Sequence, residues 1–154
     1  MASEVQDKVL IVCPRCGTAN RVPALRIGDD PKCGKCGQSI LDGRLAALDD
    51  ASFDAFVTRT GLPVVVDFWA DWCGPCHAMA PAFEKAAAEL KTRVQFAKVD
   101  TEKARNVSMR FGIRSIPTLI LFRNGMEVAR ISGARDARSL VSWTSQHAGV
   151  GTTS

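Results

Sequence analysis

The sequence predicts an α/β domain with a mixed central sheet flanked by helices, preceded by a small cysteine-bearing module. From residue 62 onward, β-branched apolar segments alternate with Ala-, Glu- and Leu-rich segments, which is typical of strands and helices in an α/β sheet. The first forty-odd residues contain no Phe, Trp or Tyr, whereas aromatic residues follow in quick succession after Leu45. The cysteines form three Cys-x-x-Cys pairs, two before this change in composition and one after it.

The chain has 154 residues, which is enough for one domain of about 100 residues and a small appendage. We place the boundary near residues 42–46. This gives an N-terminal module at 1–44, a main domain at 45–150 and a C-terminal tail at 151–154. The module has too few apolar residues to be held together by burial alone, so another source of stability is expected.

The elements of the main domain follow from their local sequences. Residues 62–70 form a continuous β-branched and aromatic run, which predicts a strand buried on both faces. The Ala-rich segment that follows predicts a helix at 75–91. Asn124-Gly125 lies between two apolar runs and is a strong hairpin signal. The remaining predicted elements are a strand at 94–99, a short helix at 101–109, strands at 118–122 and 126–131, and a helix at 136–147.

Charge and hydropathy exclude several classes of function. The net charge is only +4, and Lys and Arg are interspersed with acids, so we expect no nucleic-acid binding. No segment reaches the roughly 20 apolar residues of a membrane span. The N-terminus, M-A-S-E-V-Q-D-K, carries acids where a secretory signal would carry only bases. We therefore expect a cytoplasmic protein, and in that reducing compartment the cysteines are better suited to metal binding or redox catalysis than to static disulfides. We also expect a monomer.

The first two cysteine pairs have the spacing of a metal site. They are separated by sixteen residues, which falls within the range for a tetrahedral zinc site, and a glycine follows each pair. Disulfides, free thiols or another metal such as iron are the alternatives, and a nucleic-acid role is disfavoured because no aromatic side chain is available to stack on a base. We expect one Zn²⁺ and no organic cofactor, with these four ligands: Cys13, Cys16, Cys33 and Cys36.

The third pair lies in D-W-C-G-P-C, residues 71–76, between a predicted strand and a predicted helix. Cys73 falls at the N-terminus of the helix, and Cys76 falls within its first turn. The helix dipole and the unpaired N–H groups at that end favour a thiolate. We therefore expect Cys73 to be the nucleophile, and the more acidic and more exposed of the two thiols.

Several motifs together carry a family resemblance. They are V-D-F-W-A-D-W-C-G-P-C, followed by Pro81, then F-A-K-V-D, F-G-I-R-S-I-P-T-L and F-R-N-G. Over residues 45–148 the chain resembles thioredoxin, and with the two cysteine pairs in front it resembles the zinc-containing bacterial thioredoxins. The resemblance implies a thioredoxin fold and a protein-disulfide reductase that works by dithiol-disulfide exchange. It also implies disulfide-containing client proteins and a flavin-containing thioredoxin reductase as partners.

The resemblance also implies roles for single residues. Cys73 matches the attacking cysteine and Cys76 the resolving one. Asp67 matches a buried carboxylate that accepts or relays the proton of Cys76, and Lys98 matches its basic partner. An acid in an apolar strand costs stability unless it is paired, so a structural ion pair is the alternative role for Asp67. Pro117 matches a cis-proline that packs against the disulfide.

The apolar docking surface implied by the resemblance consists of Trp72, Gly74, Ile116 and Gly133. The backbone of Ile116 would pair with an extended client segment. One position departs from the family pattern: His77 stands where Lys or Arg often follows the resolving cysteine.

Two other functions remain open at this stage. A disulfide oxidant or isomerase would use the same motif in an oxidising compartment. A non-enzymatic zinc-bearing adaptor or holdase would carry C-G-P-C without using it. The zinc itself is expected to be either architectural or responsive to oxidation, because its four thiolates can be oxidised to disulfides.

Overall fold

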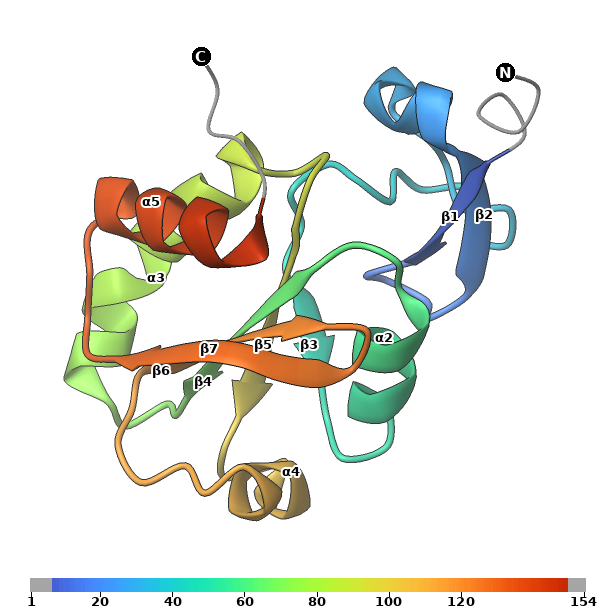
Figure 1. The fold of residues 1–154 in the computed structure, drawn as a ribbon. Coiled ribbons are helices and arrows are strands. Elements are labelled where there is room, and N and C mark those ends of the chain that lie inside the picture. The colour runs from blue at the N-terminus through green and yellow to red at the C-terminus, as the bar shows by residue number, and fades with distance from the viewer. Residues whose placement is uncertain (1–6, 150–154) are drawn as a thin grey trace.

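The structure is a computed structural model and describes residues 7–149 (Figure 1). A two-stranded sheet and a 3-10 helix precede a five-stranded sheet with four helices. In chain order the elements are β1 (Lys8–Val12), β2 (Ala19–Pro23), η1 (Ala24–Asp29), β3 (Ala46–Leu48), α2 (Phe53–Arg59), β4 (Val64–Trp69), α3 (Gly74–Glu89), β5 (Gln95–Asp100), α4 (Arg105–Arg110), β6 (Thr118–Arg123), β7 (Met126–Ser132) and α5 (Ala137–Ala148).

The larger sheet has the strand order β3-β5-β4-β6-β7, with β4 at its centre. β4 runs parallel to β5 and antiparallel to β6, while β3 is parallel to β5 and β7 is antiparallel to β6. The predicted mixed sheet is therefore confirmed. All six residues of β4 pair with β5, which sets Asp67 opposite Lys98.

Helices cover both faces of this sheet (Figure 1). Side chains of α2 and α4 pack on one face together with Val64, Val66 and Phe68 of β4, whereas α3 and α5 pack on the other face with Val65. Because side chains alternate between the faces of a strand, Asp67 points to the same face as Val65, under α3. This alternation places an acid beneath the helix that carries the cysteines.

Most of the predicted elements are present, with corrected ends. The predicted helix at 101–109 begins only at Arg105, because the backbone turns after β5: the N–H groups of Lys103 and Ala104 donate to the Asp100 carbonyl. The short elements β3 and α2, with three and seven residues, were not predicted. Elements this short show too little periodicity to be recognised.

The N-terminal module has a small apolar core of its own. β1 and β2 pair antiparallel, and the core consists of Ile11, Cys13, Val22, Cys33, Ile40 and Leu41. Two of these six buried residues are cysteines of the predicted metal site. The prediction that the module lacks a core large enough to stand alone is consistent with this small cluster.

The module is docked on the N-terminal ends of β4 and β5. The Gly61 N–H donates to the Leu10 carbonyl at 2.6 Å, and the Gln95 side-chain amide donates to the Val12 carbonyl at 3.1 Å. Val12 is buried in the same core as α2. Since β4 is six residues long, about 20 Å of strand separates this contact from the cysteines that follow β4 (Figure 1).

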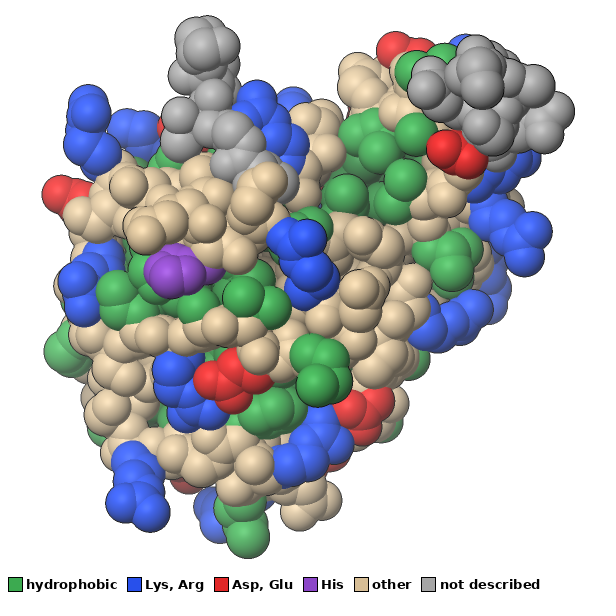
Figure 2. All heavy atoms as spheres, in the orientation of Figure 1, with side chains coloured by type: hydrophobic (Ala, Val, Ile, Leu, Met, Phe, Trp, Pro, Cys, Tyr) green, Lys and Arg blue, Asp and Glu red, His purple; other side chains and the backbone are tan. Residues whose placement is uncertain are grey.

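The surface carries no large field of one sign on the face seen in Figure 2, where Lys and Arg side chains are spread over the molecule with acids among them. Within residues 7–149 no helix is long and apolar enough to cross a membrane. The predicted tail at 151–154 lies outside the described residues, as does the start of the N-terminal module.

Candidate functional site

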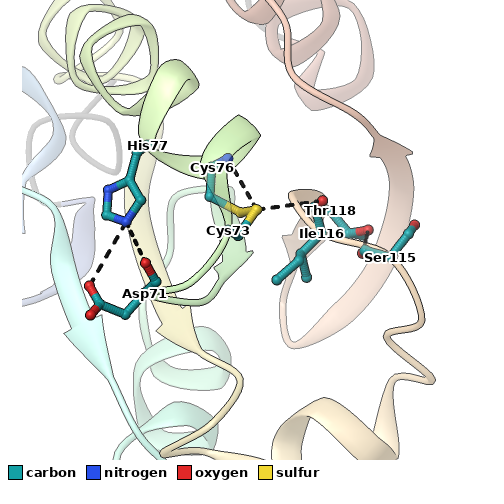
Figure 3. Close-up of a disulfide and its surroundings, with 7 residues drawn as sticks. All are labelled: Asp71, Cys73, Cys76, His77, Ser115, Ile116 and Thr118. Atoms are coloured by element: carbon teal, nitrogen blue, oxygen red, sulfur yellow. Dashed lines mark hydrogen bonds and ion pairs between the residues drawn. A yellow bond between two sulfur atoms is a disulfide. The ribbon is translucent and has the colours of Figure 1, made fainter.

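A disulfide joins Cys73 and Cys76 at the start of α3 (Figure 3). Cys73 is the N-cap residue of the helix, and its sulfur accepts a hydrogen bond from the Cys76 N–H at 3.2 Å. An N-cap side chain faces the N–H groups that have no partner within the helix. The same bond in the reduced protein stabilises a Cys73 thiolate, because both the N–H and the helix dipole favour negative charge there.

The exposure of the two residues does not distinguish them. Cys73 and Cys76 are each 3% exposed as whole residues in this oxidised form, which gives no support to the prediction that Cys73 is the more exposed of the two. The difference between them comes from the backbone instead: Cys73 caps the helix, whereas Cys76 lies inside its first turn with its side chain toward the core.

The segment 115–118 faces the disulfide from the other side (Figure 3). The Ile116–Pro117 peptide bond is cis, as the resemblance implied. The Ile116 carbonyl oxygen lies 3.8 Å from the Cys73 sulfur. The Gly133 N–H donates to the Pro117 carbonyl at 2.9 Å, and the Thr118 hydroxyl donates to the Ser115 carbonyl at 2.6 Å. These two hydrogen bonds hold the segment in place beside the cysteines.

Asp67 is a buried carboxyl beneath α3. It is 6% exposed, and its Oδ1 has no hydrogen-bond partner in the described part of the chain. Burial raises the pKa of Asp67 to about 7, and the nearby Lys98 ammonium opposes this rise. Lys98 itself lies with its Nζ 4.9 Å from the centre of the Trp69 ring. A carboxyl of this kind changes its charge near neutral pH.

Asp67, Cys76, His77 and Lys98 line one cavity of about 120 Å³, together with Leu45 from the segment before β3. The cavity has room for a few water molecules and places the carboxyl and the Cys76 side chain against a common space. The structure thus brings together three of the predicted site residues that are distant in sequence.

The four cysteines of the N-terminal module form a cluster. All four sulfurs lie within 4.8 Å of one another, with Cys13 and Cys36 at 3.7 Å and Cys16 and Cys33 at 3.6 Å. Four sulfurs at 2.3 Å from a central ion form a tetrahedron with edges of about 3.8 Å, so the cluster fits one metal ion.

Backbone N–H groups point at these sulfurs. The N–H of Arg15 donates to Cys13 at 3.4 Å, and the N–H of Lys35 donates to Cys33 at the same distance. Each loop closes with a positive-φ glycine, Gly17 and Gly37, at φ +80° and +77°. The Cys36 and Lys35 N–H groups, acting against burial, lower the pKa of Cys33 to about 6. At Cys13 burial outweighs the N–H donors and raises the pKa to about 11, so the donors favour the thiolate that a metal ion requires most clearly at Cys33.

Comparison with known protein families agrees with the fold and with the two cysteine sites. The family model described as Thioredoxin matches residues 44–146, which is most of the chain. This chain belongs to the thioredoxin family. A second model, described as Thioredoxin 2, N-terminal, a zinc ribbon, matches residues 12–38, the part that holds the four-cysteine cluster. The protein is therefore a thioredoxin of the thioredoxin 2 type and a thiol-disulfide oxidoreductase.

Individual relatives agree with this assignment. Thioredoxin C-3 of Corynebacterium nephridii is 44% identical over 138 residues, covering 90% of this chain and 94% of that protein. Thioredoxin 1 of Synechococcus elongatus is 40% identical over 102 residues, covering 66% of this chain and 95% of that protein. Among solved structures, a mutant thioredoxin from Halobacterium salinarum superposes with a TM-score of 0.63 at 27% identity, over 70% of this chain and 93% of that one.

A groove of about 510 Å³ lies next to two neighbours of the disulfide, Trp72 and Ile116, although neither cysteine lines it. It is lined by Trp72, which is 71% exposed, and by Ile116, two of the residues predicted to dock clients. The other two, Gly74 and Gly133, do not line it; both are exposed, and Gly133 contacts Pro117. The rest of the lining, including Met109, was not predicted from the sequence, because α4 and the loop after it reach the site only through the fold.

His77, the departure from the family pattern, points away from the sulfurs (Figure 3). Its Nε2 donates a hydrogen bond to the Asp71 carbonyl at 2.7 Å, and the Asp71 carboxylate lies 3.8 Å from the same nitrogen. The imidazole therefore ties the active-site loop to α3. The centres of the His77 and Trp69 rings lie 6.0 Å apart, with the two rings nearly perpendicular.

Proposed function

We propose that this thioredoxin reduces disulfides in client proteins of the cytoplasm, with Cys73 as the attacking thiol and Cys76 as the resolving thiol. The observation that carries the proposal is the N-cap position of Cys73, where the Cys76 N–H donates to its sulfur at 3.2 Å. Family membership implies disulfide-containing clients and a reductase in general terms. We infer that the reductase is a flavin-containing thioredoxin reductase and that the chain acts as a monomer.

The reaction has two exchange steps. The Cys73 thiolate attacks one sulfur of the client disulfide, which forms a mixed disulfide and releases the other client sulfur as a thiolate. The Cys76 thiolate then attacks the Cys73 sulfur, which forms the Cys73–Cys76 disulfide and releases the second client thiolate. Two electrons pass to the client, and each released thiolate takes up a proton.

In this proposal Asp67 accepts the proton of Cys76 before the second step. The support is its place across the shared cavity and its pKa of about 7, raised by burial, which lets it exchange a proton near neutral pH. Lys98, opposite Asp67 in the sheet, limits that rise. The absence of a hydrogen bond to Asp67 Oδ1 among the described residues argues against a structural ion pair as its main role.

The client is proposed to lie in the groove beside Trp72 with an extended segment against Ile116. The Ile116 carbonyl beside Cys73 is available to pair with a client N–H group, in the manner of an added strand. Gly74 and Gly133 contribute open, exposed backbone on either side, and Pro117 shapes the turn that presents Ile116.

We further propose that the four-cysteine cluster holds one Zn²⁺ with an architectural role. Four thiolates in tetrahedral spacing suit zinc, and a bound ion would link the two loops that the small module core cannot hold alone. The module contacts the ends of β4 and β5 far from Cys73, which favours support of the fold over direct contact with clients.

Serine substitutions of the two cysteines test the assignment. Cys73→Ser is expected to abolish reduction of insulin disulfides, because no attacking thiolate remains. Cys76→Ser is expected to accumulate mixed disulfides with clients, because the resolving step is lost. Trapping by the Cys73→Ser protein instead would reverse the two roles. A native protein that does not reduce insulin disulfides would favour an adaptor that does not use C-G-P-C.

A further inference from the structure

Residues 41–45 connect the zinc-binding module to β3. This segment contacts the module at its start and α3 further along. It begins with Leu41, which is 4% exposed and part of the module core. Asp42 then pairs with Arg15 at 3.2 Å, and Arg15 stands between the first two cysteines of the cluster. The start of the segment is thus attached to the metal-binding loop.

The segment next crosses α3 in close contact. Gly43 has φ +89°, and a Cβ at this position would lie 3.0 Å from the Ala88 Cα. A larger residue would be strained both by this close approach and by the backbone conformation. The path of residues 41–45 is therefore set by α3 on one side and by the module on the other.

The segment ends at Leu45, which is half-buried and packs against the apolar core formed with α3 and α5. Leu45 also lines the 120 Å³ cavity that contains the Asp67 carboxyl and the Cys76 side chain. It is the one lining residue that comes from the connecting segment; the others come from β4, β5 and α3. An apolar side chain from outside the sheet thus forms one wall of the redox site.

We propose that Leu45 is a positioning residue of the redox site, whose side chain closes the cavity behind Cys76 and keeps bulk water from the Asp67 carboxyl. The inference rests on the proposed proton exchange between Asp67 and Cys76. Leu41 and Asp42 attach the segment that carries this wall to the N-terminal module, and Gly43 fits the same segment against α3.

The physical reason is desolvation. Removing water from a carboxyl disfavours its ionised form, and Asp67 has a raised pKa for this cause. The charged and titratable side chains that share the cavity with Asp67 in the oxidised protein are Lys98 of β5 and His77 and Glu84 of α3, because Cys76 is held in the disulfide. These charged groups stay the same when Leu45 is shortened. A shift in the pKa of Asp67 would therefore be caused by the loss of the apolar Leu45 side chain.

The test compares Leu45→Ala with Ile131→Ala in the full-length oxidised protein. Ile131 is also half-buried and packs on the same core, but it does not line the cavity. The readout is the titration of the Asp67 carboxyl carbon followed by NMR. Leu45→Ala is expected to lower the Asp67 pKa by on the order of one unit, whereas Ile131→Ala leaves it in place. Leu45→Met, which refills the wall, restores the titration of the native chain.

Gly43→Ala tests whether the close contact between Gly43 and α3 positions residues 41–45. Its Cβ meets the Ala88 backbone, so the segment is pushed outward and the Asp67 pKa is expected to fall as in Leu45→Ala. An unchanged titration in Leu45→Ala, or an equal shift in Ile131→Ala, overturns the inference. If the titration shifts in Leu45→Ala while the pH profile of client reduction does not, the wall is supported and the proposed role of Asp67 fails instead.

Discussion

Replacing Asp67 by Asn gives the most direct test of how burial acts on this site. The substitution keeps the shape of the side chain and removes its charge. In the native chain the carboxyl is 6% exposed, and its Oδ1 makes no hydrogen bond within residues 7–149. An ionised group in such a place costs free energy, and Asn does not carry this cost.

The magnitude follows from the pKa. Burial raises it from 3.8 to about 7, a difference of about 3 units, and each unit corresponds to about 1.4 kcal/mol. The ionised carboxyl therefore destabilises the fold by at most about 4 kcal/mol, and by about 2 to 4 kcal/mol once water in the adjoining cavity is allowed for. Below pH 3.8 the group is protonated in both the folded and unfolded chains, so this cost is absent. It grows as the pH rises and is complete above pH 7.

The assay is urea unfolding of the oxidised protein at pH 4 and pH 8. Asp67→Asn is expected to be more stable than the native chain by about 2 to 4 kcal/mol at pH 8 and by much less at pH 4. Glu89→Gln, at an exposed position of α3, serves as the control and is expected to change stability by less than about 0.5 kcal/mol at both pH values. A lower stability for Asp67→Asn at pH 8 would refute the reasoning and make Asp67 a structural group. Client reduction should also lose a titration step near pH 7 in this variant, because no carboxyl remains to accept the proton of Cys76.

Two further predictions concern the N-terminal module. Thr60→Val removes the hydroxyl that accepts a hydrogen bond from the buried Val12 N–H at 3.3 Å. This substitution is expected to lower the free energy of unfolding, measured by urea titration, by about 1 to 3 kcal/mol. Thr58→Val, at an exposed position, is the matched control. Cys36→Ser removes one of four sulfurs, and metal analysis is expected to show loss of the single zinc while insulin reduction by the thioredoxin domain persists.

Each of these has a clear contrary result. Equal stability of the Thr60→Val and Thr58→Val proteins would show that the hydroxyl does not anchor the module. A full equivalent of zinc in Cys36→Ser would show that the remaining groups suffice, and would contradict a site made of four thiolates.

The sequence predicted the central elements because they are long or strongly patterned. β4 is a run of apolar residues around one acid, α3 starts at the C-G-P-C motif, and Asn124-Gly125 marks the β6–β7 hairpin. β3 and α2 were missed because they are stabilised by tertiary contacts and not by a local sequence pattern: β3 pairs with β5, and α2 packs on one face of the sheet. The start of α4 was misplaced because it is capped from a distance: the Asp50 carboxylate accepts from the Val107 N–H at 2.9 Å.

The sequence by itself predicted a metal site for four cysteines and dithiol exchange for the other two, because both depend on short spacings along the chain. It also singled out Asp67 as an acid in an apolar strand. Only the tertiary structure decided what surrounds these groups: the equal burial of the two active-site cysteine residues, the groove lined by Trp72 and α4, and the cavity that Leu45 lines beside Asp67. These features arise where segments far apart in sequence meet. The desolvation of a buried group depends on every element that surrounds it, and local sequence does not show which elements those are.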